Sequence, residues 1–338
     1  MFSENHPYVA KVEALMERLN NPLRDDVVGA IATEHLSAGG KRLRARLALS
    51  VLQAVSEDVE RGLGWAAACE LFHNATLIHD DIQDGDRVRR GQPAVWVTHG
   101  FEQGINAGDL LFLTPFSAVM EVGASAAIRL RLCEGLASQG AQVIRGQGLE
   151  FQLRTDLDPT IEKYLLAVRG KTSALFALPV WGALQLASQE REGGQSFVNL
   201  FNELGVAFQL QDDVLDLYGD KGRGRVGDDI REGKVSALVA EHIQSHPEDK
   251  DWIFKILKTR REETRDDDVH RLIEHFSSRG TLKSVLERMN RLRKEAFSAL
   301  PKGGEEELHQ LAEDFWQTLL VPIEPLWRST LGIGPRSD

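Results

Sequence analysis

The chain of 338 residues has few cysteines, no long apolar run and no excess of basic charge, and each shortage excludes a class of protein. Its two cysteines, Cys69 and Cys133, do not make a disulfide framework and suit a reducing compartment, so we expect a cytoplasmic protein. No stretch approaches the roughly 18 apolar residues of a membrane-spanning helix, so we expect no stable membrane insertion. A formal net charge of −11 argues against a nucleic-acid partner.

Strand signals are also scarce, because few segments alternate polar residues with β-branched or aromatic ones. Apolar residues recur instead at three- and four-residue intervals, which is typical of helices. There is no internal repeat and no linker long enough to separate two domains. We predict an all-α fold, a single helical domain over residues 1–338, with helices over 8–18, 43–56, 64–83, 105–122, 126–154, 161–188, 196–217, 233–245, 251–259, 268–276, 281–298 and 304–320.

An acidic cluster ends the strongly apolar helix expected over 64–83. Asp80 and Asp84 are four residues apart and share a helix face, and Asp81 lies beside them. Carboxylates this close repel one another, and bare charge is costly at the end of an apolar helix. A divalent cation removes both costs, and hard oxygen ligands favour Mg²⁺. For this cluster alone, a solvated acidic helix end is the simpler interpretation.

The same DDxxD pattern returns at the end of the apolar helix expected over 196–217. Asp212, Asp213 and Asp216 repeat the spacing of the first cluster, and Gln209 lies one turn earlier. Two such clusters predict two carboxylate walls of one cavity. Two unrelated acidic caps are the alternative.

Basic residues accompany the acidic clusters. The segment GGKRLR (39–44) opens a helix, where backbone N–H groups and the helix dipole favour an anion. Arg89 and Arg90 follow the first acidic cluster. Metal together with diphosphate fits this mixture of acid and base; a glycine cap and a surface salt-bridge cluster are the alternatives.

Three further segments carry polar groups that suit a phosphate site. His73 lies two turns before Asp80 on the same face, either as a satisfied core histidine or as a polar contact in the cavity. Lys171 and Thr172 follow a glycine at an expected helix kink. The glycine-rich, charged segment 224–234 has the composition of a mobile loop over phosphates, although an ordinary exposed loop has the same composition.

The chain resembles the trans-isoprenyl diphosphate synthases, or polyprenyl synthetases, through motifs that follow in the family's order over residues 39–234: GGKRLR, FHNATLIHDDIQD, RRGQP, AGDLLF, GQGLEF, GKTSALF, FQLQDDVLD and GDDIREGK. The resemblance implies a prenyltransferase of isoprenoid biosynthesis that joins an allylic diphosphate to isopentenyl diphosphate head to tail. It implies an all-α fold with a deep central cavity, and a homodimer. It also implies about three Mg²⁺ ions per active site.

The resemblance assigns roles to individual residues. The catalytic, metal-binding carboxylates are Asp80, Asp81, Asp84, Asp212, Asp213 and Asp216. The positions that match the isopentenyl diphosphate site are Gly40, Lys41, Arg44, His73 and Arg90. Those that match the allylic diphosphate site are Arg89, Lys171, Thr172, Gln209 and Lys234, and Lys171 also counts as catalytic. Arg225 is a further candidate for substrate binding. Ala45, Trp96 and Arg225 stand where the family usually has Pro, His and Lys, which leaves the geometry of closure over the diphosphate open.

Product length should depend on side chains that precede the first acidic cluster. Thr76 and Ala75 lie four and five residues before Asp80, about 6–7.5 Å along a helix, and both are small. Family members that stop at the farnesyl stage carry aromatic residues there, so we expect a product of geranylgeranyl length or longer. Phe112 and Phe116 are candidates for the floor of the cavity, with Phe116 favoured by its match to the family. Plain core packing of both rings and a farnesyl-length product are the alternatives.

Other classes of function have distinct signatures. A terpene cyclase or head-to-head synthase of the same fold should lack GGKRLR, and a non-catalytic partner subunit should have degraded DDxxD motifs, whereas this chain has all three motifs intact. A helical scaffold with acidic metal-binding ends is a further alternative. The sequence alone leaves open the allylic substrate, the pathway, the oligomeric state and the role of the C-terminal tail.

Overall fold

The computed structural model describes residues 6–20, 26–55, 58–187, 194–219, 226–301 and 306–332. Helices dominate these residues, and two strands of two residues each are the only β-structure among them, which confirms the all-α prediction. The chain divides into two compact units. The first contains 1–139, 177–198 and 302–311, and the second contains 140–176, 199–301 and 312–338. The expectation of one domain over 1–338 stays a prediction.

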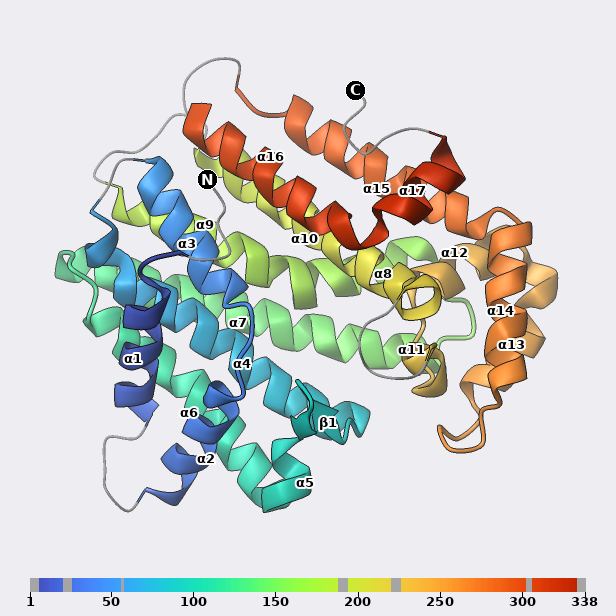
Figure 1. Ribbon diagram of the computed structural model, residues 1–338, viewed down its shortest axis with the longest axis horizontal. Helices are drawn as coiled ribbons and strands as arrows, with labels where there is room; N and C mark the ends of the chain where they lie inside the picture. The colour runs from blue at the N-terminus through green and yellow to red at the C-terminus, as the bar shows by residue number, and fades with distance from the viewer. Residues whose placement is uncertain are drawn as a thin grey trace. The chain divides into compact units, whose positions relative to one another are not determined.

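The first unit is organised around α4, which is buried along most of its length and packs on α6 (Figure 1). The Trp65 indole N–H donates to the carbonyl of Pro179 at 3.1 Å, and Gly182 leaves room for the ring. The elements that lie wholly in this unit are α1 (Val9–Asn20), α2 (Val27–Ser37), α3 (Leu43–Ala54), η1 (Val59–Gly62), α4 (Leu63–Asp84), β1 (Val88–Arg89), β2 (Gln92–Pro93), α5 (Val95–His99) and α6 (Phe101–Met120).

The second unit contains a buried helix, α12, that packs on α15 and α8. The elements that lie wholly in it are α8 (Ile161–Val168), η2 (Arg169–Ser173), α11 (Asp228–Arg231), α12 (Ala237–Ser245), η3 (Pro247–Asp249), α13 (Lys250–Leu257), α14 (Asp266–Ser278), α15 (Thr281–Ser298), η4 (Val321–Ile323) and α17 (Glu324–Leu331). Residues of both units belong to α7 (Ala126–Thr155), α9 (Ala174–Leu186), α10 (Gly194–Tyr218) and α16 (Glu306–Leu320).

Most predicted helices are confirmed to within a few residues, and the differences have local causes. The helix predicted over 233–245 begins at Ala237, because Ser236 caps it through a hydrogen bond from the Val239 N–H to its hydroxyl and Gly233 has a positive φ of 71°. The helix predicted over 161–188 is interrupted. Among the elements that were not predicted are α2, α11 and α17.

The interruption at 169–173 is a π-helical segment, η2, between α8 and α9. It confirms the expected kink beside Lys171. The segment crosses α7 at two glycines: a Cβ on Gly146 would lie 2.2 Å from the backbone nitrogen of Lys171, and one on Gly170 would lie 2.8 Å from the Cα of Gly146. Because backbones meet here without side chains between them, the position of the π segment depends on both glycines.

A β-hairpin connects the first acidic helix to α5. Val88 pairs with Pro93 and Arg89 with Gln92 in antiparallel register, so the loop consists of Arg90 and Gly91 alone. Both loop residues have positive φ, 54° and 75°. This is the two-residue turn that matches the twist of paired strands. RRGQP was predicted as a phosphate motif, and its backbone is also a tight turn.

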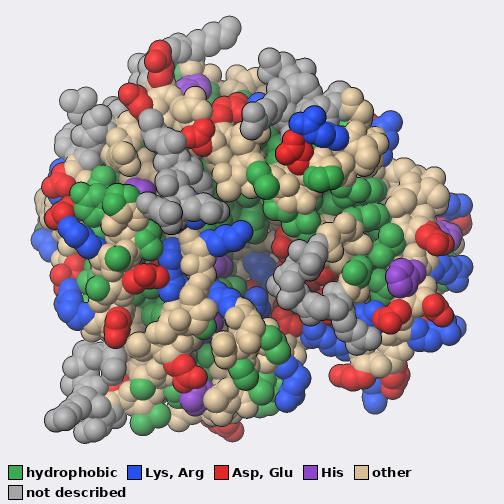
Figure 2. Space-filling view, in the orientation of Figure 1, with side chains coloured by type: hydrophobic (Ala, Val, Ile, Leu, Met, Phe, Trp, Pro, Cys, Tyr) green, Lys and Arg blue, Asp and Glu red, His purple; other side chains and the backbone are tan. Residues whose placement is uncertain are grey.

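The surface carries charges of both signs. On the face shown in Figure 2, Lys and Arg side chains are interspersed with Asp and Glu side chains. Within the described ranges, no helix combines the length and the apolar character needed to cross a bilayer.

The glycine contact at the π segment gives a stability prediction. Gly146→Ala should lower the free energy of unfolding by about 1–3 kcal/mol, because its methyl group would meet backbone rather than a movable side chain. Gly148, two residues along α7, has nothing within 4 Å of the same position, so Gly148→Ala should be neutral or stabilising by up to about 1 kcal/mol. Urea unfolding of both variants measures this difference, and equal stabilities would contradict the close backbone contact.

Candidate active site

The first acidic cluster ends α4 and presents its three carboxylates differently. Asp81 is buried, with 1% of its surface exposed, and the Arg89 guanidinium donates to its Oδ1, with 2.8 Å from Nε. Asp80 and Asp84 are only half-buried. Gly85 ends the helix in the left-handed region, and the N–H of Asp86 closes the turn onto the carbonyl of Asp81 at 2.9 Å. The hairpin that places Arg89 therefore fixes the middle carboxylate of the motif.

Asp81 is incompletely compensated in spite of its ion pair. Burial raises its pKa to about 6, against the lowering effect of Arg89, and the neighbouring charges of Asp86 and Asp80 raise it further. Its second oxygen, Oδ2, is buried without a hydrogen-bond partner. A cation nearby would favour the ionised carboxylate.

The second acidic cluster ends α10 in the second unit and repeats this arrangement. Asp213 is buried, and its Oδ2 accepts hydrogen bonds from the Tyr164 hydroxyl and the Ala237 N–H, both at 2.7 Å. Its Oδ1 accepts from the Gln209 amide at 2.9 Å. The middle carboxylate of this motif is thus held by protein donors on three sides.

The other two carboxylates of this cluster differ from each other. Asp216 is buried, and its Oδ2 accepts the N–H of Asp229 at 3.2 Å, whereas Asp212 is half-buried. Burial, followed by the charge of Asp229, raises the pKa of Asp213 to about 7. Asp213 and Asp229 therefore share a buried region, and a cation bound there would stabilise their ionised forms.

The arrangement of the two motifs fits Mg²⁺ binding at their partly exposed carboxylates. Asp80, Asp84 and Asp212 are the members of the two motifs with partly exposed side chains, and Asp81 and Asp213 are committed to protein donors. Within the described ranges, neither motif brings three carboxylates to one point. That arrangement suits a cation that takes one or two carboxylates and completes its shell with phosphate and water oxygens.

The GGKRLR segment confirms the predicted glycine turn and helix start. Gly39 and Gly40 have positive φ, Arg42 adopts the left-handed conformation, and α3 begins at Leu43. Arg90 donates from Nη1 to the carbonyl of Gly39, which ties the hairpin to this turn. A Cβ on Gly40 would lie 2.9 Å from the Arg90 guanidinium carbon, so the glycine permits the approach.

Glu70 organises this basic region, although the sequence analysis did not single it out. It is buried on α4, and its Oε2 accepts the N–H of Ala45 in the first turn of α3 at 3.2 Å. Its charge also offsets the burial that lowers the pKa of Arg44 to about 10. Asn74, one turn later, accepts from Arg90 at 3.3 Å. A carboxylate inside an otherwise apolar helix was the signal in the sequence that could have identified it.

His73 lies among these cations. Burial lowers its pKa well below the ordinary value, and the charges of Arg44, Arg90 and Arg89 lower it further. Its Nδ1 is buried without a hydrogen-bond partner. The same cause, burial followed by nearby arginines, lowers the pKa of His35 to about 3. Neutral histidines surrounded by guanidinium groups form an environment that an anion would stabilise. Lys41, which belongs to GGKRLR together with Arg44, has an exposed side chain.

The π segment η2 contains Lys171 and Thr172, two of the predicted site residues. Thr172 donates from its hydroxyl to Gln209 at 2.9 Å, so Gln209 bridges Thr172 and Asp213. Lys171 pairs with Glu150 of α7 at 3.0 Å. Single π turns occur often at functional sites. The structure therefore places Thr172 and Gln209 at the second acidic cluster, whereas Lys171, next to Thr172, pairs with Glu150. Their roles at the allylic diphosphate stay predictions.

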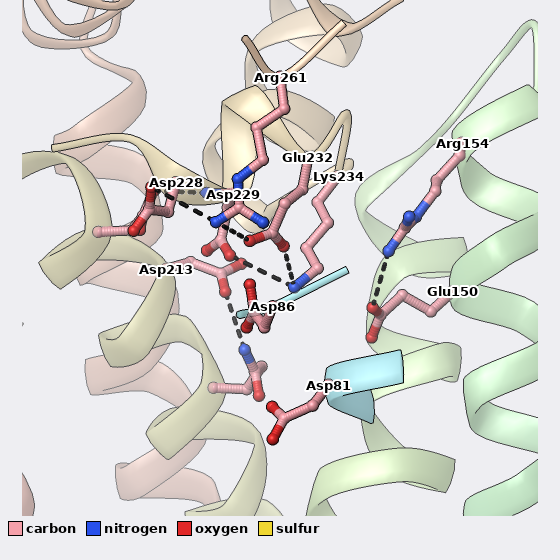
Figure 3. A network of polar contacts seen from close by, with 12 residues as sticks. Asp81, Asp86, Glu150, Arg154, Asp213, Asp228, Asp229, Glu232, Lys234 and Arg261 are labelled. Atoms are coloured by element: carbon pink, nitrogen blue, oxygen red, sulfur yellow. Dashed lines mark hydrogen bonds and ion pairs between the residues drawn. The ribbon is translucent and has the colours of Figure 1, made fainter. Parts of the chain in front are cut away.

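The segment after the second cluster is not the exposed loop that its composition predicted. Residues 228–231 form the helical turn α11 with all four side chains buried, and Arg231 donates to the carbonyl of Thr264 at 2.6 Å. Figure 3 shows how Lys234 lies between Glu232, at 2.6 Å, and Asp229, at 3.6 Å, while Arg261 contacts Glu232 at 3.3 Å. The exposed-loop alternative is wrong for residues 228–231, because these charges are buried in ion pairs. The role of the segment as a mobile loop over phosphates stays a prediction. Arg225 lies outside the described residues.

The residues proposed to control product length lie where α4 meets α6. Ala75 is fully buried, and Thr76 is buried with its hydroxyl bonded to the carbonyl of His73 at 2.7 Å. The Phe112 ring packs against Phe72, with ring centroids 5.2 Å apart. Phe116, one turn further along α6, is half-buried. Their effect on product length stays a prediction.

Fold and site together define an all-α protein in which each of two DDxxD motifs buries its middle carboxylate among protein donors and in which Arg90 contacts the glycine turn of GGKRLR. The polyprenyl synthetase family matches residues 25–276, so the chain belongs to this family. A short chain isoprenyl diphosphate synthase of Methanocaldococcus jannaschii is 38% identical over 229 residues, which are 67% of this chain and 69% of that protein.

Solved structures agree with this assignment. A geranylgeranyl pyrophosphate synthetase from Pyrococcus horikoshii superposes with a TM-score of 0.81 at 30% identity, over 91% of this chain and 95% of that one. A polyprenyl synthase from Caulobacter crescentus, complexed with calcium and isoprenyl diphosphate, superposes with a TM-score of 0.78 at 29% identity, over 91% and 93% of the two chains.

The raised pKa of Asp213 predicts an unusual pH dependence of stability. A carboxyl group whose pKa rises from 3.8 to about 7 on folding contributes stability below pH 3.8, and that contribution is lost as the pH rises through about 7. In chelator, the free energy of unfolding of the wild type should therefore fall, relative to Asp213→Asn, between about pH 4 and pH 7. Urea titrations across this range measure the difference. If the free energy of unfolding of the wild type and of Asp213→Asn changed with pH in the same way, Asp213 would not have a raised pKa in the folded protein.

Proposed function

We propose that the chain is a Mg²⁺-dependent prenyltransferase that condenses an allylic diphosphate with isopentenyl diphosphate head to tail and releases a trans-polyprenyl diphosphate. The observation that carries the proposal is the repeated carboxylate geometry. In each DDxxD motif the middle carboxylate is buried and held by protein donors, while the first one is partly exposed. Family membership and the similarity to the Methanocaldococcus and Pyrococcus proteins support the same reaction.

In this mechanism the two acidic motifs serve the same allylic diphosphate. Asp80, Asp84 and Asp212 would hold Mg²⁺, which would supply Lewis-acid stabilisation of the leaving diphosphate when bound. Lys171 and Lys234 add positive charge as the allylic carbon–oxygen bond breaks. Apolar helix faces keep water away from the allylic cation, which water would quench.

The acceptor, isopentenyl diphosphate, is assigned to the basic region of the first unit. Gly40, Lys41, Arg44, His73 and Arg90 are proposed to bind its diphosphate. The support is the position of His73 beside the charges of Arg44, Arg90 and Arg89, and the contact of Arg90 with the glycine turn, which bring several cations to one region. The acceptor double bond attacks the allylic cation, and the departing diphosphate accepts the proton that is then lost.

We further propose a cytoplasmic homodimer with a product of geranylgeranyl length or longer. The apolar residues Ile105, Leu113 and Met120 of α6 are exposed at spacings of about two helical turns, which supports association of α6 with a second copy. The absence of an aromatic residue at Ala75 and Thr76 supports a long product, as does the similarity to a geranylgeranyl pyrophosphate synthetase.

Loss of one partly exposed carboxylate from either motif tests the reaction. Asp80→Ala and Asp212→Ala should each lower turnover of farnesyl and isopentenyl diphosphates by at least about a hundredfold, because each removes a ligand of the Mg²⁺ that would stabilise the leaving group. Asp267→Ala, which removes an exposed carboxylate from the first turn of α14, serves as the control and should leave turnover unchanged. Near-normal turnover in either motif variant would exclude a joint role of the two motifs.

Product chromatography tests the chain-length proposal. With excess isopentenyl diphosphate, Ala75→Phe should shorten the product, because a ring would fill the volume next to the buried α4 face. Phe116→Ala should lengthen it. The wild type should yield geranylgeranyl diphosphate or longer products, and accumulation of farnesyl diphosphate alone would show that this account of the cavity is wrong.

A further inference from the structure

Three metal-ligating side chains converge in the second unit, on elements that neither acidic motif uses. They are His242 at the C-terminal half of α12, Asp249 at the end of η3 and His275 in the last turn of α14. One ligand atom from each lies within 4.8 Å of the others. The Nε2 of His242 is 3.0 Å from the Oδ2 of Asp249, and the Nδ1 of His275 is 3.9 Å from the same oxygen. Among the described residues this is the one such group.

Each of the first two ligands is held by a second hydrogen bond at its other polar atom. The Nδ1 of His242 lies 2.7 Å from the Thr281 hydroxyl at the start of α15. The Oδ1 of Asp249 accepts the Trp252 indole N–H at 3.0 Å. Partners of this kind fix the ring orientation and tautomer of a metal-binding histidine and leave the facing atom available. The third ligand atom, Nδ1 of His275, is buried without a hydrogen-bond partner.

The protonation states also suit a metal. Burial raises the pKa of Asp249, but hydrogen bonds from Trp252 and His242 and the charge of Arg279 outweigh it and lower the pKa to about 2. Burial lowers the pKa of His242 below its ordinary value. At neutral pH the group therefore offers a carboxylate and a neutral imidazole, the forms that bind metal.

We propose that His242 Nε2, Asp249 Oδ2 and His275 Nδ1 form a binding site for a borderline-soft divalent cation of the Zn²⁺ class, separate from the carboxylate motifs. Two imidazoles and one carboxylate suit Zn²⁺ and disfavour Mg²⁺, which prefers oxygen ligands. Ligands about 2.0–2.2 Å from a tetrahedral Zn²⁺ lie about 3.4 Å apart, so the 3.9 Å separation would close by about 0.5 Å and the 3.0 Å separation would open by about 0.4 Å. Solvent completes the shell, because the side chain of His275 is 32% exposed.

The guanidinium group of Arg279 also contacts the carboxylate of Asp249. Arg279 Nη1 lies 2.6 Å from Asp249 Oδ2 and 2.8 Å from Glu248 Oε1. When a metal takes the Oδ2 of Asp249, Arg279 keeps its ion pair with Glu248, so no guanidinium is left without a carboxylate. Bound metal would tie α12, η3 and α14 together at one point, and its effect should appear as thermal stability.

Zn²⁺ binding to the tag-free chain tests the site. Equilibrium dialysis against Zn²⁺, with excess Mg²⁺ to occupy the carboxylate motifs, should give one tightly bound Zn²⁺ per chain and raise the melting temperature. His275→Ala should weaken this binding by at least about tenfold and abolish the rise in melting temperature. His275 is the residue to change, because it is partly exposed, whereas His242 is fully buried and its loss could unfold the chain.

A neighbouring histidine provides the matched control. His270 is exposed on the same helix, so His270→Ala removes an imidazole from α14 without touching the cluster and should bind Zn²⁺ like the wild type. The proposal is overturned if the wild type binds no Zn²⁺ under these conditions. It is equally overturned if His275→Ala and His270→Ala bind Zn²⁺ with the same affinity while both melt like the wild type without metal.

Discussion

Burial of the middle carboxylate of the motif at the end of each acidic helix is the constraint on which the rest of the site depends. A charged carboxylate is costly in an apolar environment unless donors surround it. The donors come from other elements: Arg89 of the hairpin, eight residues further on, for Asp81, and Tyr164 of α8 with the first turn of α12 for Asp213. Satisfying the middle carboxylate thus fixes the end of the helix and the direction of the carboxylates beside it.

The sequence predicted the helices well because their apolar periodicity is strong and local. It predicted α4 and α10 with ends close to the observed ones, and it placed a kink at the glycine before Lys171. It could not predict that the kink is a π turn, since that depends on contact between the backbones of Gly146 and Gly170, which are remote in sequence. The hairpin at 88–93 was missed because two-residue strands leave no alternating pattern.

Motif spacing identified the acidic and basic residues but could not distinguish their roles. Asp80 and Asp81 are equivalent in the motif, and only the tertiary structure shows that Asp81 is committed to Arg89. Tyr164 carried no signal at all, because nothing in its neighbourhood points to Asp213. The segment 228–231 looked exposed because it is rich in charge, and it is buried because those charges find partners in other segments, Arg261 for Asp228 and Asp266 for Arg231. Pairing across the fold is the information that one sequence does not contain.

Arg90 combines a strained backbone conformation with the contact that ties the hairpin to the glycine turn. Its φ of 54° lies in the left-handed region, which costs an ordinary L-residue about 1–2 kcal/mol. Asparagine or glycine would occupy this turn position at lower cost. The chain instead has a guanidinium there, which reaches the carbonyl of Gly39. Selection for thermal stability alone would therefore tend to remove this arginine. Stabilising substitutions in the enzyme should for that reason be sought outside the hairpin loop, so that Arg90 is kept.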